Sequence, residues 1–187
     1  MKVKVAISAH HIHLTKKDLD ILFGENYELH KRNDLSQKGQ FASLETVKIK
    51  TLKGEMVLRV LGPVRDYTQA EVSKTDAYKL GINPPVRNSG DIIGSEKVTI
   101  IGPNGIIEDK ECCIIADRHI HMSEEESINY GLKNGEIVSV KVNGEKGGIM
   151  DNVHIRVASN FSLEMHIDTD DGNAFLLSGG EELEVIK

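Results

Sequence analysis

Two copies of a His-Ile-His tripeptide are the residues of this chain best suited to chemistry. His11-Ile12-His13 lies near the N-terminus, and His119-Ile120-His121 lies past the middle. Side chains two residues apart on a strand face the same side, so each tripeptide presents two imidazoles together. Neutral imidazole is a common ligand of zinc and related metals. One such tripeptide fits a polar strand face equally well, but two copies in matching contexts predict metal binding.

The two histidine pairs occupy matching places in an internal repeat. Each follows a short apolar run, 3–7 or 112–116, and each precedes a short helix that ends at a glycine. Thr15 and Ser123 are typical first residues of such helices, because acidic residues follow them within the first turn. We expect the first strand to continue to His13, so that one face changes from apolar side chains to imidazoles.

The remaining sequence predicts many short strands and few helices. Turn signals and alternating hydrophobicity place strands at 45–51, 56–61, 97–101, 112–116, 136–142, 152–157, 163–167 and 182–186. Further capped helices are expected to start at Ser73 and near Thr169. Residues 25–43 are polar and irregular, which is typical of a lid or binding loop. This pattern favours barrels or sandwiches over a doubly wound sheet.

Composition excludes several classes of function. The chain has 187 residues and a formal net charge of -6, which disfavours a nucleic-acid surface. No apolar run approaches the length of a membrane-spanning helix, and no signal peptide precedes the first strand, so we expect a cytoplasmic protein. Cys112 and Cys113 are adjacent in an apolar run, so we expect buried free thiols.

Three further residues could join the chemistry of the histidine pairs. Arg65 follows a Gly-Pro turn and offers a rigid fork for phosphate or an oxyanion, although a solvated arginine would fit there too. Glu71 could be a third metal ligand, and His166 lies on the polar face of a predicted strand. His30 and His154 have no such company, so we interpret them as surface or core residues.

Five segments together resemble the propanediol-utilisation type of phosphate acyltransferase, the phosphate propanoyltransferase or phosphotransacylase family associated with bacterial microcompartments. The resemblance extends from about residue 3 to residue 177. The segments are Ser-Ala-His-His-Ile-His-Leu-Thr at 8–15, Leu-Gly-Pro-Val-Arg at 61–65, Pro-Pro-Val-Arg-Asn-Ser-Gly-Asp at 84–91, Arg-His-Ile-His-Met at 118–122 and His-Ile-Asp-Thr-Asp at 166–170.

The resemblance implies transfer of an acetyl or propanoyl group between coenzyme A and phosphate, with two zinc ions per chain. By the matching motifs, one zinc would be held by His11, His13 and Glu71, and the other by His119, His121 and His166. Arg65 matches the catalytic arginine of the family. The positions that match coenzyme A contacts are Ser8, Arg59, Leu61, His166 and Asn173.

The resemblance also implies a mainly β fold of two small β-barrels with short capping helices, related by the internal repeat. Residues 1–9 and 117–187 would form one barrel, and residues 10–23 and 44–116 the other. Residues 24–43 would form a lid-like insertion over the active site. The family further implies a homodimer and no nucleic-acid or membrane partner.

Two departures from the family pattern are visible. His10 stands where an arginine usually precedes the first His-x-His, and strand parity places His10 on the opposite face from His11 and His13. The sequence starts directly at the first strand, without the extension that targets microcompartment members, which suggests a free cytoplasmic enzyme that prefers acetyl groups. The same ligands would also suit a dinuclear metallohydrolase or a metal-binding structural protein.

Overall fold

The computed structural model describes residues 1–186, which divide into two compact units. Unit 1 joins Met1–Ala9 to the chain from Asp117 onward, and unit 2 is His10–Ala116. Strands dominate both units, and the described residues contain four short helices. No helix among these residues is long and apolar enough to cross a membrane.

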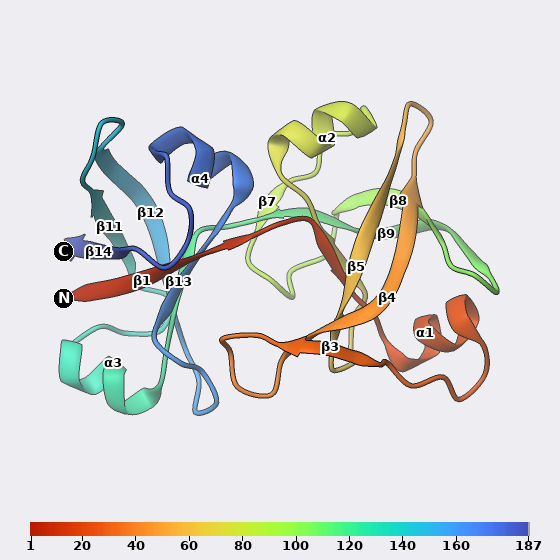
Figure 1. Cartoon of the computed structure of the whole chain (residues 1–187), viewed down its shortest axis with the longest axis horizontal. Coiled ribbons are helices and arrows are strands. Elements are labelled where there is room, and N and C mark those ends of the chain that lie inside the picture. The colour runs from red at the N-terminus through yellow and green to blue at the C-terminus, as the bar shows by residue number, and fades with distance from the viewer. Residues whose placement is uncertain (187) are drawn as a thin grey trace. The chain divides into compact units, whose positions relative to one another are not determined.

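Unit 1 is a closed barrel of six strands. Their order around the barrel is β1-β13-β10-β12-β11-β14. The strands are β1 (Lys2–Ser8), β10 (His119–Met122), β11 (Ile137–Val142), β12 (Gly148–Val157), β13 (Glu164–Asp168) and β14 (Glu182–Ile186). Two helices, α3 (Glu124–Tyr130) and α4 (Thr169–Phe175), lie on opposite sides of these strands (Figure 1).

Alternating side chains fill the core of unit 1. Val3 and Val5 of β1 are buried together with Val138, Val140 and Val142 of β11. This period-two burial is the pattern of a barrel whose interior is packed with side chains.

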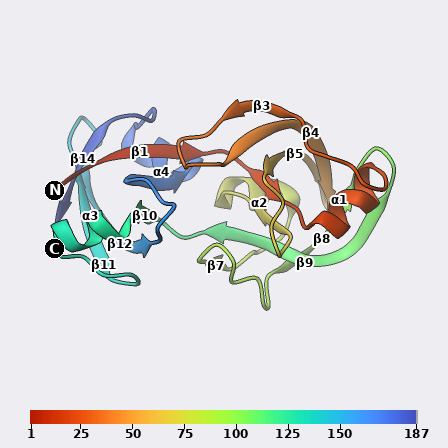
Figure 2. The same ribbon diagram turned by 90° about the horizontal axis from the view of Figure 1, so that it is seen from below.

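Unit 2 contains a second ring of six paired strands. The order β4-β5-β2-β6-β9 closes because β8 pairs with both β4 and β9, while β3 and β7 lie outside the ring against β4 and β9. The strands are β2 (His11–His13), β3 (Lys31–Asp34), β4 (Phe41–Lys50), β5 (Glu55–Gly62), β6 (Gln69–Glu71), β7 (Val86–Arg87), β8 (Glu96–Ile101) and β9 (Ile106–Ala116). The helices are α1 (Lys16–Phe23) and α2 (Lys74–Leu80) (Figure 2).

The predicted starts of the helices are confirmed. The side chains of Thr15, Ser73 and Ser123 each accept a hydrogen bond from the backbone N–H three residues later, which satisfies a donor that the first helical turn leaves unpaired. Asp168 caps α4 in the same way. The predicted mainly β class with two barrels and short helices is confirmed as well.

The expected continuous first strand is wrong. β1 ends at Ser8, and β2 begins at His11 with different partners: β1 pairs with β13 and β14, whereas β2 pairs with β5 and β6. The interruption between the two strands falls at Ala9 and His10, where the chain exchanges its hydrogen-bonding partners. The apolar run and the first histidine pair therefore belong to different units.

Two local predictions have different outcomes. Cys112 and Cys113 are fully buried free thiols, and burial raises the pKa of Cys112 to about 12, as expected for an apolar site. Residues 25–43 are not wholly irregular, because β3 pairs there with β4. The strand has four exposed polar residues, so hydrophobic alternation gave no sign of it.

Candidate metal and acyl-transfer site

His11, His13 and Glu71 form a cluster of metal-ligand type in unit 2. One potential ligand atom from each residue lies within 4.8 Å of the others. The His11 and His13 rings lie 5.1 Å apart, and His11 Nε2 lies 3.4 Å from Glu71 Oε2. Two imidazoles and a carboxylate are a donor set that zinc accepts.

Strand register brings these three side chains together. β2 and β6 pair antiparallel with His11 directly opposite Glu71. Directly opposed residues point to the same side of the sheet with Cβ atoms about 5 Å apart. Ile12, between the histidines, points into the core and is fully buried. The buried isoleucine therefore anchors the strand while its two neighbours face the glutamate.

The protonation state of His13 suits metal binding. Burial lowers its pKa well below the usual 6.5, and the charges of His11 and Arg65 act in the same direction. The ring is therefore neutral at physiological pH. Its Nδ1 atom is buried and has no hydrogen-bond partner among residues 1–186. A buried lone pair of this kind fits an electrophile such as a metal ion.

Arg65 belongs to a hydrogen-bond network that reaches this cluster. Its side chain donates to Tyr67 Oη at 3.2 Å, Ser89 Oγ at 3.3 Å and Gln40 Oε1 at 3.4 Å. These acceptors are neutral, and no ion pair joins Arg65 to a carboxylate among the described residues. The half-buried guanidinium thus keeps its positive charge available for an anion.

Gln69 connects that network to the carboxylate of Glu71. Its amide nitrogen donates to Glu71 Oε1 at 2.6 Å and to Ser89 Oγ at 2.8 Å, while its oxygen accepts from the Gly90 N–H at 2.7 Å. Because a carboxylate only accepts and a backbone N–H only donates, the orientation of this amide is fixed. A continuous path therefore runs from Arg65 through Ser89 and Gln69 to Glu71.

His119, His121 and His166 form a second cluster, in unit 1. Their ring centroids lie 4.6 to 5.2 Å apart in each pair. Phe161 stacks on His121 at 4.0 Å, and Glu164 Oε2 lies 3.2 Å from His166 Nε2. Three imidazoles at this spacing offer a nitrogen-rich donor set, which zinc also accepts.

The backbone fixes the tautomer of His119. Its Nδ1 atom lies 2.8 Å from the carbonyl oxygen of Asp117, which can only accept, so Nδ1 carries the proton. In the neutral ring, Nε2 then carries the lone pair, which is the tautomer typical of metal-binding histidines. The Asp117 carboxylate lies 3.0 Å from His154 Nε2, so His154 pairs with an acid beside this cluster.

The two clusters are built in the same way. β10 and β13 pair antiparallel with His119 opposite His166, as β2 and β6 pair with His11 opposite Glu71. Ile120 is buried between its two histidines, as Ile12 is. Each unit thus carries a His-x-His strand and a third candidate ligand on the neighbouring antiparallel strand. The register places all six predicted ligands in these two sets.

The residues predicted to contact coenzyme A lie in both units. Ser8, His166 and Asn173 belong to β1, β13 and α4 of unit 1, and Ser8 pairs with Asp168 in register. Arg59 and Leu61 belong to β5 of unit 2. Arg59 donates to the carbonyl oxygens of Ser43 at 2.7 Å and Leu44 at 3.3 Å. That role for these residues stays a prediction.

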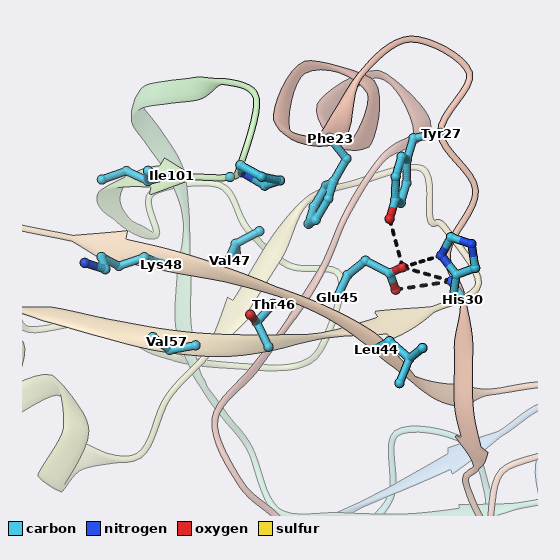
Figure 3. Close-up of a pocket in the computed structure, with 12 residues that line it drawn as sticks. Phe23, Tyr27, His30, Leu44, Glu45, Thr46, Val47, Lys48, Val57 and Ile101 are labelled. Carbon is cyan, nitrogen blue, oxygen red and sulfur yellow. Dashed lines mark hydrogen bonds and ion pairs between the residues drawn. The ribbon is translucent and has the colours of Figure 1, made fainter.

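A separate hollow of about 690 Å³ lies on unit 2 between the end of α1 and strands β4 and β5 (Figure 3). Its walls are mainly apolar, and its polar centre is the buried carboxylate of Glu45. Glu45 accepts from Tyr27 Oη at 3.1 Å, from His30 Nδ1 at 2.7 Å and from the His30 backbone N–H (Figure 3). No predicted site residue lines this hollow, and Glu45 ties the chain after α1 to β4.

Sequence reasoning missed the residues that connect and orient the ligands. Gln69 and Ser89 are polar residues in short segments, and the 84–91 motif by itself predicts no role for Ser89. Asp117 acts on His119 through its backbone carbonyl, for which a side-chain pattern offers no signal. His10, one of three candidate imidazoles, contacts Asp76 Oδ2 at 3.0 Å and is not part of the ligand cluster.

Comparison with known proteins agrees with the resemblance in the motifs. A sequence model of the phosphate propanoyltransferase family matches residues 4–178. Proteins named phosphate propanoyltransferase are similar over nearly the whole chain. The relative from Thermotoga maritima is 48% identical over 98% of this chain and 88% of its own length. Relatives from Lachnoclostridium phytofermentans and Priestia megaterium are 50% and 53% identical over 98% and 96% of this chain, and 87% and 83% of their own lengths.

Proposed function

The chain belongs to the phosphate propanoyltransferase family of enzymes, which exchange acyl groups between coenzyme A and phosphate, and we propose that it transfers a short acyl group, acetyl or propanoyl, at a site with two zinc ions. The relatives from Thermotoga maritima and the two other organisms are named after the propanoyl group. The choice between acetyl and propanoyl for this chain is part of the proposal.

The surroundings of Arg65 support the proposal most directly. A phosphate acceptor needs a cationic site whose charge is not already neutralised, and the three side-chain acceptors of the Arg65 guanidinium among residues 1–186 are neutral oxygens. The guanidinium also lies close enough to His13 for its charge to lower the pKa of that ring. Arginine's planar fork suits bidentate binding of phosphate. We therefore assign phosphate binding and neutralisation of the developing oxyanion to Arg65.

Both clusters fit zinc by their donor atoms, and in the first cluster the lowered pKa of His13 keeps that ring neutral. His11, His13 and Glu71 would hold one ion, and His119, His121 and His166 the other. Zinc at such sites supplies a Lewis acid that stabilises negative charge on an oxygen or a departing thiolate. Three protein ligands per ion would leave a position for substrate, as catalytic zinc sites do.

The reaction itself requires no nucleophilic side chain. A phosphate oxygen attacks the thioester carbonyl carbon, a C–O bond forms, the C–S bond breaks, and coenzyme A leaves as thiolate. Arg65 orients the phosphate for this attack and stabilises charge on the tetrahedral oxygen. Cys112 and Cys113 are unsuited to a covalent role, because both thiols are fully buried.

We further propose that residues 24–43 cover the site as a lid. Gln40 near its end accepts a hydrogen bond from Arg65, and Tyr27 and His30 near its start bind Glu45 of β4. The segment is thus attached at both ends, and one attachment is the phosphate-binding arginine. Binding of substrate at Arg65 would compete with the Gln40 contact and so couple the lid to occupancy. Ser8, Arg59, Leu61, His166 and Asn173 stay the proposed coenzyme A contacts.

An assay of acyl-CoA consumption with and without phosphate tests the function. Loss of the thioester absorbance is followed while acyl phosphate is trapped as the hydroxamate. We expect consumption and acyl phosphate only when phosphate is present. Consumption without phosphate would instead identify a hydrolase, and no consumption of either acetyl-CoA or propanoyl-CoA would leave a binding protein. The ratio of kcat/KM for the two thioesters gives the acyl preference.

Homodimer formation and a cytoplasmic location also stay proposals. Light scattering coupled to gel filtration measures the mass of the particle in solution. Fractionation of cells that express the chain measures where it resides, including inside a microcompartment.

A further inference from the structure

A second feature repeats in both units beside the ligand strands. The residue immediately before each His-x-His contacts an aspartate in the first turn of a helix. In unit 2, His10 Nδ1 lies 3.0 Å from Asp76 Oδ2 of α2. In unit 1, Arg118 donates from Nε at 2.9 Å and from Nη2 at 2.8 Å to the two carboxylate oxygens of Asp171 in α4.

The two aspartates occupy equivalent positions. Asp76 is three residues after the helix cap Ser73, and Asp171 is three residues after the helix cap Asp168. In each case the backbone N–H of the aspartate donates to the cap side chain, so the first turn holds the carboxylate in place. Asp76 also lies five residues after Glu71, and Asp171 five residues after His166, the third ligand of each cluster.

In each unit this contact links the two strands that carry the candidate ligands to the helix that follows them. The strand with two histidines and the strand with the third ligand are paired by backbone hydrogen bonds. The helix that follows the third-ligand strand then reaches back to the residue that precedes the two histidines. We propose that Asp76 and Asp171 are positioning residues, each of which clamps the start of a His-x-His strand and so fixes the directions of its imidazoles toward a metal.

The clamp has a physical reason at this place in the chain. Residues 9–10 and 117–118 are where the chain leaves one set of strand partners and takes up another. These residues lie outside the strands, and at the start of β10 the Arg118 carbonyl oxygen accepts one backbone hydrogen bond, from the His154 N–H at 2.9 Å. A charge-assisted contact held by a helix turn adds a side-chain restraint at each of these positions. It is a bidentate arginine pair in unit 1 and an imidazole–carboxylate pair in unit 2.

The inference rests on the proposed zinc sites, and its test measures zinc affinity directly. The full chain is used in two single-site backgrounds: His119→Ala keeps only the first cluster, and His11→Ala keeps only the second. Zinc affinity is measured by competition with a chromogenic chelator. In the first background we expect Asp76→Asn to weaken zinc binding about tenfold, the scale typical when a partner of the ligand shell is lost. Asp171→Asn should do the same only in the second background.

Matched controls separate positioning from general stability. Lys79→Met removes the other ion pair of Asp76, at 3.3 Å, and Glu182→Gln removes a surface ion pair with Lys2 in unit 1. Both should leave zinc affinity unchanged. Exchange of the pair as Arg118→Asp with Asp171→Arg should restore affinity lost in Asp171→Asn, and thermal unfolding of each apo-protein reports the cost in stability.

The outcomes distinguish the clamp from the function. If the parent chains bind zinc and the Asp76 and Asp171 variants bind it equally tightly, the clamp is wrong while the metal sites stand. If affinity falls equally in both backgrounds for each variant, the aspartates act on folding and the clamp is again wrong. If the parents bind no zinc, the metal sites and the clamp both fail, whatever the acyl-transfer assay shows.

Discussion

Replacement of Gln69 by leucine tests whether the hydrogen-bond path from Arg65 to Glu71 matters. Gln69 is fully buried, and the change keeps its approximate size while removing three hydrogen bonds. The bond to the Glu71 carboxylate is worth about 1.5–3 kcal/mol and the two neutral bonds about 0.5–1.5 kcal/mol each. Because Gly90 is exposed and can bind water instead, we expect the lower end, a loss of about 3 kcal/mol in the free energy of unfolding.

Zinc affinity gives the sharper readout of the same change. Glu71 loses the donor that orients its carboxylate, so binding at the first cluster should weaken about 10- to 100-fold while the second cluster is unaffected. Chelator competition measures the affinity, and urea unfolding of the apo-protein measures the stability. The control is Thr51→Val, which removes hydrogen bonds from the Thr51 hydroxyl to Gly54 and Leu80 at the β4–β5 turn. Equal zinc affinity in the two variants would refute the path and leave Gln69 as a packing residue.

Four further predictions follow from the site. Arg65→Ala should keep zinc and fold but lower kcat/KM about 10²- to 10³-fold. Arg65→Lys should recover little of this activity, because lysine lacks the bidentate fork. A normal rate in Arg65→Ala would show that Arg65 is a solvated turn residue. Elemental analysis should find about two zinc ions per chain, and a chelator should abolish turnover. His10→Arg should keep both metals, because arginine can also pair with Asp76, whereas His11→Ala should lose one; the reverse result would place the ligand at His10. Cys112 and Cys113 should resist thiol reagents at pH 8 until the chain unfolds, which free-thiol titration measures.

The features that the sequence predicts well are those that depend on a few neighbouring residues. His11 and His13 share a face because of strand parity, and Thr15 and Ser123 cap helices because their hydroxyls reach a backbone N–H three residues on. Parity held for the histidines even though the continuous strand was wrong. It required only that residues 11–13 be extended, not that they continue β1.

Contacts between residues that are far apart in the sequence could not be predicted from local patterns. Glu71 lies opposite His11 because β6 pairs with β2, and one helix and three strands separate these two strands in the sequence. Periodicity in a single sequence carries no register between such strands. The resemblance to the family supplied Glu71 and His166 as candidates, and only strand pairing shows why these residues can meet their histidines. The exchange of partners after Ser8 was invisible for the same reason.

A second pattern in the sequence repeats beside the His-x-His tripeptides. Glu71-Val72-Ser73-Lys74-Thr75-Asp76 and His166-Ile167-Asp168-Thr169-Asp170-Asp171 share one pattern: ligand, buried apolar residue, helix cap, two residues, aspartate. The helix cap stands two residues after the third ligand. The strand that carries this ligand must therefore end at the cap, and the helix must begin next to the site. The internal repeat therefore includes more than the His-x-His strands. It repeats the whole unit that makes a site, in which one strand brings two imidazoles, a second brings the third ligand, and a helix turn returns an acid to the first strand.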